Sequence, residues 1–350
     1  MIQAVKHPRV AIVYSLSKRS EIVSLDDEPY LIHDRYLGQT LNTLTRILYW
    51  AQSPKPGEHI FYRTLAEEAL LRGDALGAKL AHGVAADLRR YWKVRQVGSS
   101  REVFLEVLFQ ELFVLVHEYC HLLMATLPEF AASRRRIGVL LTESEYDPAI
   151  DEARYVAFRL RYPDGGSFEK FAEIGLVMRT FLRENQALLV DELACDDFAL
   201  NVLLHYARAE GHPASLPVRA SFLSLRHIRA LQYLRDATAS EGAHTDVGGS
   251  VETRLLQARQ HRLRTAYHVA ANQAGYDLGP EDAVWRELAD LSDLHDRRID
   301  EPILFRIIPR FAKARRRLTV KEPQGGITEC FRLASLTGWS PSSELDYLLL

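Results

Sequence analysis

Hydrophobic residues recur at helical spacing along most of the chain, and this pattern predicts a largely helical protein. A helix over residues 29–52 would place on one side the apolar residues Leu37, Leu41, Leu44, Ile47 and Leu48. The same spacing predicts further helices, two of them within 60–92 and the others over 101–127, 168–184, 187–208, 221–237, 251–274 and 280–297.

Short runs rich in branched residues predict a few strands among these helices. They are RVAIVYSL at 9–16, WKVRQVG at 92–98 and, after a basic turn, the later part of RRRIGVLLTE at 134–143. The segments SPKPG at 53–57 and GHPASLP at 211–217 contain the proline and glycine that interrupt helices. Together these elements predict an α+β fold that is predominantly helical.

Residues 238–250, TASEGAHTDVGGS, are the best candidate for a loop or linker because small and turn-forming residues replace the helical pattern there. This segment divides the chain into a region over 1–237, which contains its most apolar helices, and a region over 251–350. We expect the second region to be helical and to pack on the first.

The composition is that of a globular protein, with 47% hydrophobic and 26% charged residues among 350. No apolar run approaches the roughly 18 residues that a membrane span needs, and the first residues lack the features of a secretory signal. The three cysteines, Cys120, Cys195 and Cys330, are too few for a disulfide framework. We therefore expect a cytoplasmic protein that does not enter membranes.

Basic residues gather at 134–136 and again over 306–321. Patches of this kind can bind nucleic acid or an acidic protein. The net charge of −2 gives no general attraction to nucleic acid. We therefore interpret both patches as solvated helix ends, and nucleic acid is not the expected partner.

The helix predicted over 101–127 contains HEYCH, a His-Glu-x-x-His motif formed by His117, Glu118 and His121. Residues four apart lie on one face of an α-helix, so the two imidazoles can bind the same metal ion. Zinc bound in this way needs a third protein ligand and a position for water, and Glu118 can then accept a proton from that water. An apolar helix would bury these three polar residues at a high cost if they had no such role.

The third ligand is expected on a later helix, since Met124 and Leu127 stand where the longer motif HExxHxxGxxH would require glycine and histidine. The segment DELACDDFAL at 191–200 supplies Glu192 and, on the same helical face, Asp196. We predict that Glu192 coordinates zinc and that Asp196 accepts the N–H of a ligating histidine. Weaker candidates for the third ligand are Glu143, Glu145, Glu152, Glu184 and His205.

The motifs HEYCH at 117–121 and DELACDDFA at 191–199 resemble those of the gluzincin superfamily of zinc metallopeptidases. The resemblance implies a zincin-like catalytic core within 1–237, built on the helices over 101–127 and 187–208. It also implies site residues with distinct roles, namely the zinc ligands His117, His121 and Glu192, the catalytic base Glu118, and Asp196, which orients a ligand.

This resemblance implies a peptidase that acts inside cells on a protein or peptide substrate. Two intracellular groups of similar style act in phage immunity, where a repressor is cut, and in phage exclusion, where a translation factor is cut. We expect a zinc endopeptidase with a restricted protein substrate, active in regulation or in defence against phage or stress.

The alternative is a sensor or interaction protein whose zinc site is structural or inactive. A closed site with four protein ligands, including Cys120 or Cys195, would favour this alternative. The two cysteines each occupy one motif near its metal-facing side, so their thiols could also approach one another as a redox-sensitive pair. Two small buried core residues are the simpler interpretation.

Peptide hydrolysis also requires a donor that stabilises the oxyanion of the tetrahedral intermediate. The candidates on the later helices are His227, Tyr233, His261, Tyr267 and His268. We rank His261 and His268 first as catalytic residues, because they belong to an arginine-rich helix that follows the 238–250 segment.

Overall fold

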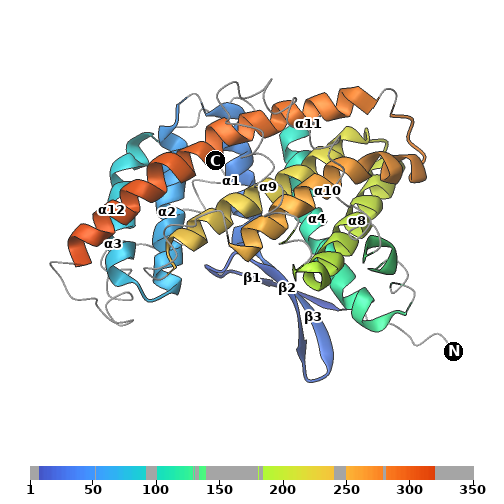
Figure 1. Ribbon diagram of the computed structural model, residues 1–350, viewed down its shortest axis with the longest axis horizontal. Helices are drawn as coiled ribbons and strands as arrows, with labels where there is room; N and C mark the ends of the chain where they lie inside the picture. Colours follow the sequence, from blue (N-terminus) through green and yellow to red (C-terminus); the bar gives the residue numbers. More distant parts are fainter. Residues whose placement is uncertain are drawn as a thin grey trace.

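The computed structural model describes residues 8–51, 53–91, 101–128, 130, 134–138, 180, 184–239, 250–278 and 281–319. Most of these residues are helical, and a small three-stranded sheet lies against one side of the helices (Figure 1). The predicted class, α+β and predominantly helical, is confirmed. None of the described helices combines the length and apolar character that crossing a membrane requires.

The sheet consists of β1 (Arg9–Val13), β2 (Ser20–Leu25) and β3 (Glu28–Asp34) in the order β1-β3-β2. The central strand β3 is parallel to β1 and antiparallel to β2. Asp26 and Asp27 form the turn between β2 and β3 with φ values of 52° and 60°, which suit the tight turns of hairpins. Only the first of these strands was predicted from the sequence.

The described helices are α1 (Arg35–Trp50), α2 (Lys55–Leu71), α3 (Ala75–Leu88), α4 (Arg101–Thr126), α8 (Gln186–Ala209), α9 (Ser215–Ala237), α10 (Val251–Gln273), α11 (Glu281–His295) and α12 (Ile308–Thr319). A short 3-10 helix, η1 (Arg89–Tyr91), follows α3, and two π-helical segments, η2 (Asp296–Asp300) and η3 (Pro302–Ile307), join α11 to α12. The helices that were predicted to carry the metal motifs are α4 and α8.

Several boundaries differ from the predictions, among them the start of α9, which begins at Ser215 rather than at residue 221. Residues 29–34 are strand rather than helix, because Asp34 caps α1 by accepting the backbone N–H of Tyr36 and so starts the helix at Arg35. Only the first part of the SPKPG segment separates helices, because α2 already begins at Lys55. Proline in its first turn is tolerated, since the missing backbone N–H has no partner within the helix there. Residues 134–138, predicted as a basic turn and the beginning of a strand, are helical.

Several predicted elements lie outside the described residues. They are the strand over 92–98, the remainder of the strand over 134–143, most of the helix over 168–184, and most of the 238–250 segment.

A single large cluster of buried apolar side chains joins helices from both halves of the chain. It contains Phe109 and Phe113 of α4, Leu203 of α8, Tyr267 of α10 and Phe311 of α12. The helix α4 packs against α1, α8 and α9, while α10 packs against α8 and α9. This packing fixes the faces of α4, α8 and α10 that carry the polar residues described next.

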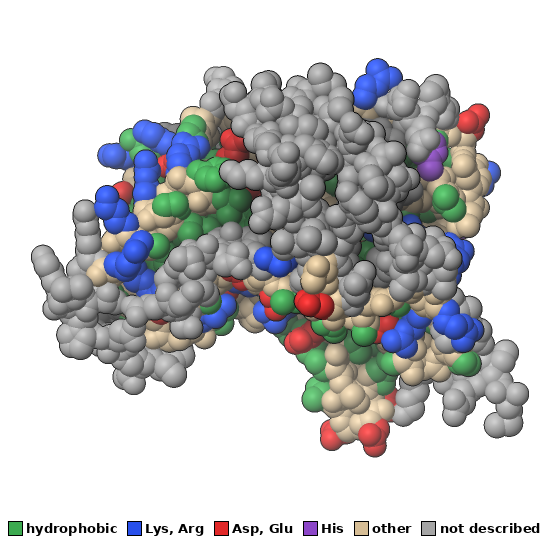
Figure 2. Space-filling model, in the orientation of Figure 1, with side chains coloured by type: hydrophobic (Ala, Val, Ile, Leu, Met, Phe, Trp, Pro, Cys, Tyr) green, Lys and Arg blue, Asp and Glu red, His purple; other side chains and the backbone are tan. Residues whose placement is uncertain are grey.

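Lysine and arginine side chains gather at the end of the molecule where α2, α3 and α12 lie (Figure 2). Some of the basic residues of the 306–321 segment are engaged in ion pairs there. Arg315 contacts Asp74 at 2.8 Å, and Arg306 lies 3.6 Å from Glu58. These contacts attach α12 to the start of α3 and η3 to α2.

Candidate metal centre

The helices α4, α8 and α10 meet on one side of the molecule (Figure 1) and bring the two motifs together. A cavity of about 250 Å³ lies at this junction. Its lining includes His117, Glu118 and His121 of α4, Glu192 of α8 and Arg259 of α10. The first four are residues that the sequence predicted for one site.

The potential ligand atoms of three residues lie at nearly equal separations. The Nε2 atoms of His117 and His121 are 3.2 Å apart. One carboxylate oxygen of Glu192 lies 3.3 Å from Nε2 of His117, and the other lies 3.4 Å from Nε2 of His121. Tetrahedral zinc with bonds of about 2.1 Å holds its nitrogen and oxygen ligands about 3.4 Å apart. The two imidazoles and the carboxylate are therefore close enough to share a metal ion, and each histidine faces a different oxygen of Glu192.

Asp196 orients the ring of His117. Its Oδ1 lies 2.8 Å from Nδ1 of His117, so a proton on Nδ1 is donated to the carboxylate and Nε2 faces the other ligand atoms. Asp196 is almost completely buried and lies one helical turn after Glu192 on α8. The predicted contact between the carboxylate of Asp196 and a ring nitrogen of His117 is present.

Arg259 of α10 joins the acidic residues of α8 from the other side. Its Nε and Nη2 contact the two oxygens of Asp196 at 2.7 and 2.8 Å, and its Nη1 contacts Glu192 at 2.7 Å. Nη2 also lies 3.3–3.4 Å from the ring nitrogens of His117. A planar guanidinium suits this paired contact with a carboxylate.

These contacts set the charges at the site. Burial would raise the pKa of Glu192, but Arg259 and the two histidines hold that pKa far below its usual range. Burial and Arg259 would lower the pKa of His117, yet Asp196 and Glu192 outweigh them and raise it to about 9. The metal-free site thus holds an ionised Glu192 and a protonated His117 at neutral pH.

Glu118 lines the same cavity and is partly buried. Burial raises the pKa of its carboxyl group, although the neighbouring His117 and His121 act in the opposite direction. A raised pKa brings the carboxyl group closer to the range in which it can both accept and release a proton.

Cys195 gives the site a second possible donor. His117, His121 and Cys195 form a group that could hold a metal ion, because one ligand atom from each lies within 4.8 Å of the others. Cys195 and Cys120 are both buried and free, and a hydrogen bond between their thiols, together with burial, raises the pKa of Cys195. The two thiols lie close together, and both residues are buried, which agrees with their interpretation as small core residues.

Among the described side chains, none of the predicted oxyanion donors lines this cavity. His227 is buried between Thr45 and His295. His268 packs beside Tyr267 with ring centroids 4.8 Å apart, and its Nε2 has no hydrogen-bond partner within the described ranges.

The position of His268 along α10 explains why it lies elsewhere. His268 follows Arg259 by nine positions, which places the two on opposite faces of a helix with 3.6 residues per turn. His261 belongs to α10, but its side chain is not among those that the structure describes. For both residues the catalytic role remains a prediction.

The two described weaker candidates for the third ligand do not line the cavity. Glu184 and His205 are exposed, and residues 143, 145 and 152 fall outside the described ranges. Arg259 is the site residue that sequence reasoning missed. The acidic face of α8 was a signal for it, since a buried carboxylate, Asp196, and a half-buried one, Glu192, one turn apart favour a neighbouring cation.

Comparison of the chain with protein-family models, with curated proteins and with solved structures finds no match.

Proposed function

We propose that this protein is a zinc-dependent peptidase of gluzincin type, with His117, His121 and Glu192 as the metal ligands. The observation that carries the proposal is the spacing of 3.2–3.4 Å among the ligand atoms of these residues. It is supported by Glu118, which a purely structural zinc site would not need.

A zinc ion bound by these residues would polarise a peptide carbonyl group and lower the pKa of water. Glu118 would take the proton from the attacking water and transfer it to the leaving amine. Asp196 would keep Nδ1 of His117 protonated and its Nε2 turned toward the metal position. Arg259 would hold the carboxylates of Glu192 and Asp196 in place and compensate their charge.

We further propose that the substrate is a restricted set of proteins or peptides. The cavity of about 250 Å³ that contains the site admits few side chains at once. Its walls present charged groups beside apolar ones such as Phe113 and Leu231, so a substrate must match both size and polarity.

The replacement of Glu118 by glutamine tests the mechanism. Glu118→Gln should bind one zinc ion per chain, as the wild type does, but should cleave a peptide library at least about 100-fold more slowly, the usual contribution of a catalytic base. Glu111→Gln is the matched control, because Glu111 belongs to the same helix but does not line the cavity. Equal cleavage by Glu118→Gln and wild type would exclude the assigned mechanism.

A second candidate function is a sensor or interaction protein with a structural zinc site, and Cys195 is the observation that favours it. Ligation by the two histidines, Glu192 and Cys195 would close the tetrahedron and leave no position for water. The variant Cys195→Ala separates the two functions. The peptidase predicts unchanged zinc content and cleavage, whereas the structural site predicts loss of zinc and of thermal stability.

A further inference from the structure

The cavity at the metal centre has a second polar region that the proposed mechanism does not use. Lys18 and Arg19, which precede β2, and Arg235 of α9 line this cavity together with the metal motifs. The charged neighbours that influence the pKa of Arg235 are Glu68, Arg19 and Arg72, and none of them belongs to the two motifs. We call Arg19 and Arg235 the basic pair.

The loop that carries Arg19 is held in a defined conformation. Asp34 is fully buried and accepts hydrogen bonds from the hydroxyl of Ser15 at 2.6 Å and from the backbone N–H of Lys18 at 2.8 Å. Lys18 has a φ of 49°, a conformation that non-glycine residues rarely adopt. Arg235 fixes the same loop from α9, since its Nη2 donates to the carbonyl oxygen of Ser17 at 2.7 Å. Such imposed backbone conformations are common at binding sites.

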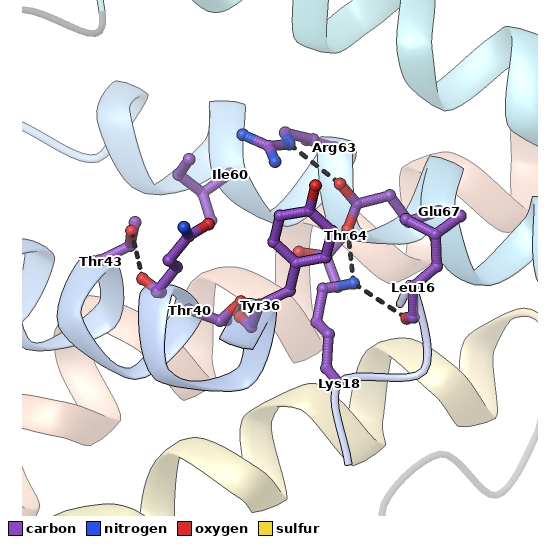
Figure 3. Close-up of a pocket in the computed structure, with 10 residues that line it drawn as sticks. Leu16, Lys18, Tyr36, Thr40, Thr43, Ile60, Arg63, Thr64 and Glu67 are labelled. Atoms are coloured by element: carbon purple, nitrogen blue, oxygen red, sulfur yellow. Dashed lines mark hydrogen bonds and ion pairs between the residues drawn. The ribbon is translucent and has the colours of Figure 1, made fainter. Parts of the chain in front are cut away.

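Lys18 itself is already neutralised. Its ammonium group points into a neighbouring pocket, where it pairs with Glu67, and Arg63 approaches Glu67 from the opposite side at 3.0 Å (Figure 3). Of the basic residues at the loop, Arg19 and Arg235 therefore face the metal cavity, whereas the charge of Lys18 is balanced in the neighbouring pocket.

The basic pair has donors that the described part of the chain does not use. Arg19 is exposed, and its side chain makes no ion pair or hydrogen bond with any described residue. Arg235 is only 8% exposed. It contacts Glu68 through Nε at 3.3 Å and the loop carbonyls through Nη2, while its Nη1 has no partner among the described residues. Burial and the nearby cations lower the pKa of Arg235, although Glu68 opposes them.

We propose that Arg19 and Arg235 form a subsite that binds a carboxylate of the substrate, away from the bond that is cleaved. This inference rests on the proposed peptidase function and names the chemical class of its substrate, an acidic peptide. Guanidinium groups suit this role because they bind carboxylates through charge-assisted hydrogen bonds. The carboxylate comes either from an aspartate or glutamate side chain or from the end of the peptide chain.

Peptide binding to the inactive, zinc-loaded Glu118→Gln protein tests the subsite without any need for cleavage. The probes are two random heptapeptide libraries, one with amidated and one with free C-termini, and the retained peptides are identified by mass spectrometry. Enrichment of aspartate and glutamate in the amidated library indicates a side-chain carboxylate. Stronger retention of peptides from the free-acid library than from the amidated library, whatever the peptide sequence, indicates a terminal carboxylate.

The second variant is Arg19→Glu in the same background, because this exposed side chain can change without loss of the fold. It should weaken the retention of the selected peptides about tenfold, the effect of one charge-assisted hydrogen bond. Arg310→Glu on α12 is the matched charge reversal outside the cavity and should leave retention unchanged.

Retention without any carboxylate preference, equal retention by Arg19→Glu, or no retention at all would each overturn the subsite. Failure of the peptidase proposal has a different signature. In that case the wild-type protein leaves the same libraries uncut, whatever the binding experiment shows.

Discussion

At the scale of single residues, the proposed metal centre is organised by consecutive contacts from Arg259 to Asp196 and from Asp196 to His117. Each of these contacts is 2.7–2.8 Å long. Arg259 keeps Asp196 ionised, Asp196 fixes the proton of His117 on Nδ1, and His117 thereby presents Nε2 to the other ligand atoms. The proposed ligand His117 is thus oriented by two residues outside the proposed ligand set.

The replacement of Asp196 by asparagine should weaken zinc binding by about 10- to 100-fold, because the ring of His117 loses its fixed tautomer. Competition with a chromogenic chelator measures the affinity. Asp197→Asn is the matched control, since Asp197 is the next residue, also pairs with an arginine, Arg262 at 2.9 Å, and does not contact the histidines. Its zinc affinity should stay within about twofold of wild type. Equal effects of the two variants would contradict the role of Asp196.

Zinc binding should also depend on pH, because His117 with a pKa of about 9 must lose its proton before it can bind the metal. Below pH 9 each binding event releases this proton, so the apparent zinc affinity should rise with pH, by up to about tenfold per unit between pH 7 and 8.5. Calorimetry in buffers of different ionisation enthalpy counts the released protons. Binding without proton release from His117 would contradict the assignment.

At the scale of elements, Asp34 determines where the sheet ends and the helices begin. It is the last residue of β3, it caps α1 through Tyr36, and it holds the loop over 15–18. One buried carboxylate thereby sets the start of a helix and the shape of the loop that carries Arg19.

Asp34→Ala should lower the free energy of unfolding by about 2–4 kcal/mol, because a helix cap and several buried hydrogen bonds are lost together. Urea denaturation followed by circular dichroism measures this loss. Asp74→Ala is a milder comparison, since Asp74 caps α3 through the single N–H of Gly77 and pairs with Arg315. A loss at Asp34 no larger than that at Asp74 would show that the loop contacts contribute little.

At the scale of the whole molecule, a buried polar chain connects helices that are distant in sequence. Thr45 of α1 contacts His227 of α9 at 3.2 Å, and His227 contacts His295 of α11 at 3.0 Å. Asp300 then contacts His295 at 3.4 Å and Arg229 at 2.6 Å. These side chains lie inside the helical bundle, so their protonation affects its stability.

Burial and the neighbouring histidine lower the pKa of His227, and burial also lowers the pKa of His295. Both remain neutral in the fold while the unfolded chain takes up protons near pH 6.5. Their contribution to stability is therefore complete above about pH 6.5 and is lost as the pH falls. We expect the free energy of unfolding of the metal-free protein to decrease between pH 6.5 and 5, by up to about 1.4 kcal/mol per pH unit for each histidine.

The variant His227→Gln should reduce this slope, because glutamine does not titrate. His205→Gln, at an exposed position of α8, should leave the slope as in the wild type. Denaturant titrations at several pH values supply the measurement, and an unchanged slope in His227→Gln would contradict the prediction.

The sequence by itself determined the helical class, the helices α4 and α8, and the two motifs that they carry. It could do so because the spacing of apolar residues and the four-residue repeat of His117 and His121, or of Glu192 and Asp196, are local properties of a helix. The short strands β2 and β3 were missed. The predicted helix was extended back to residue 29, although the turn at Asp26 and the helix cap at Asp34 place the start of α1 at Arg35.

Only the tertiary structure decided what surrounds the two motifs. Arg259 lies beside Glu192 because α10 packs against α8, and no spacing within either helix contains that information. The basic pair likewise joins a loop before β2 to the end of α9, more than two hundred positions apart in the chain. Contacts between distant elements depend on how their faces pack, which the local pattern of one segment does not specify.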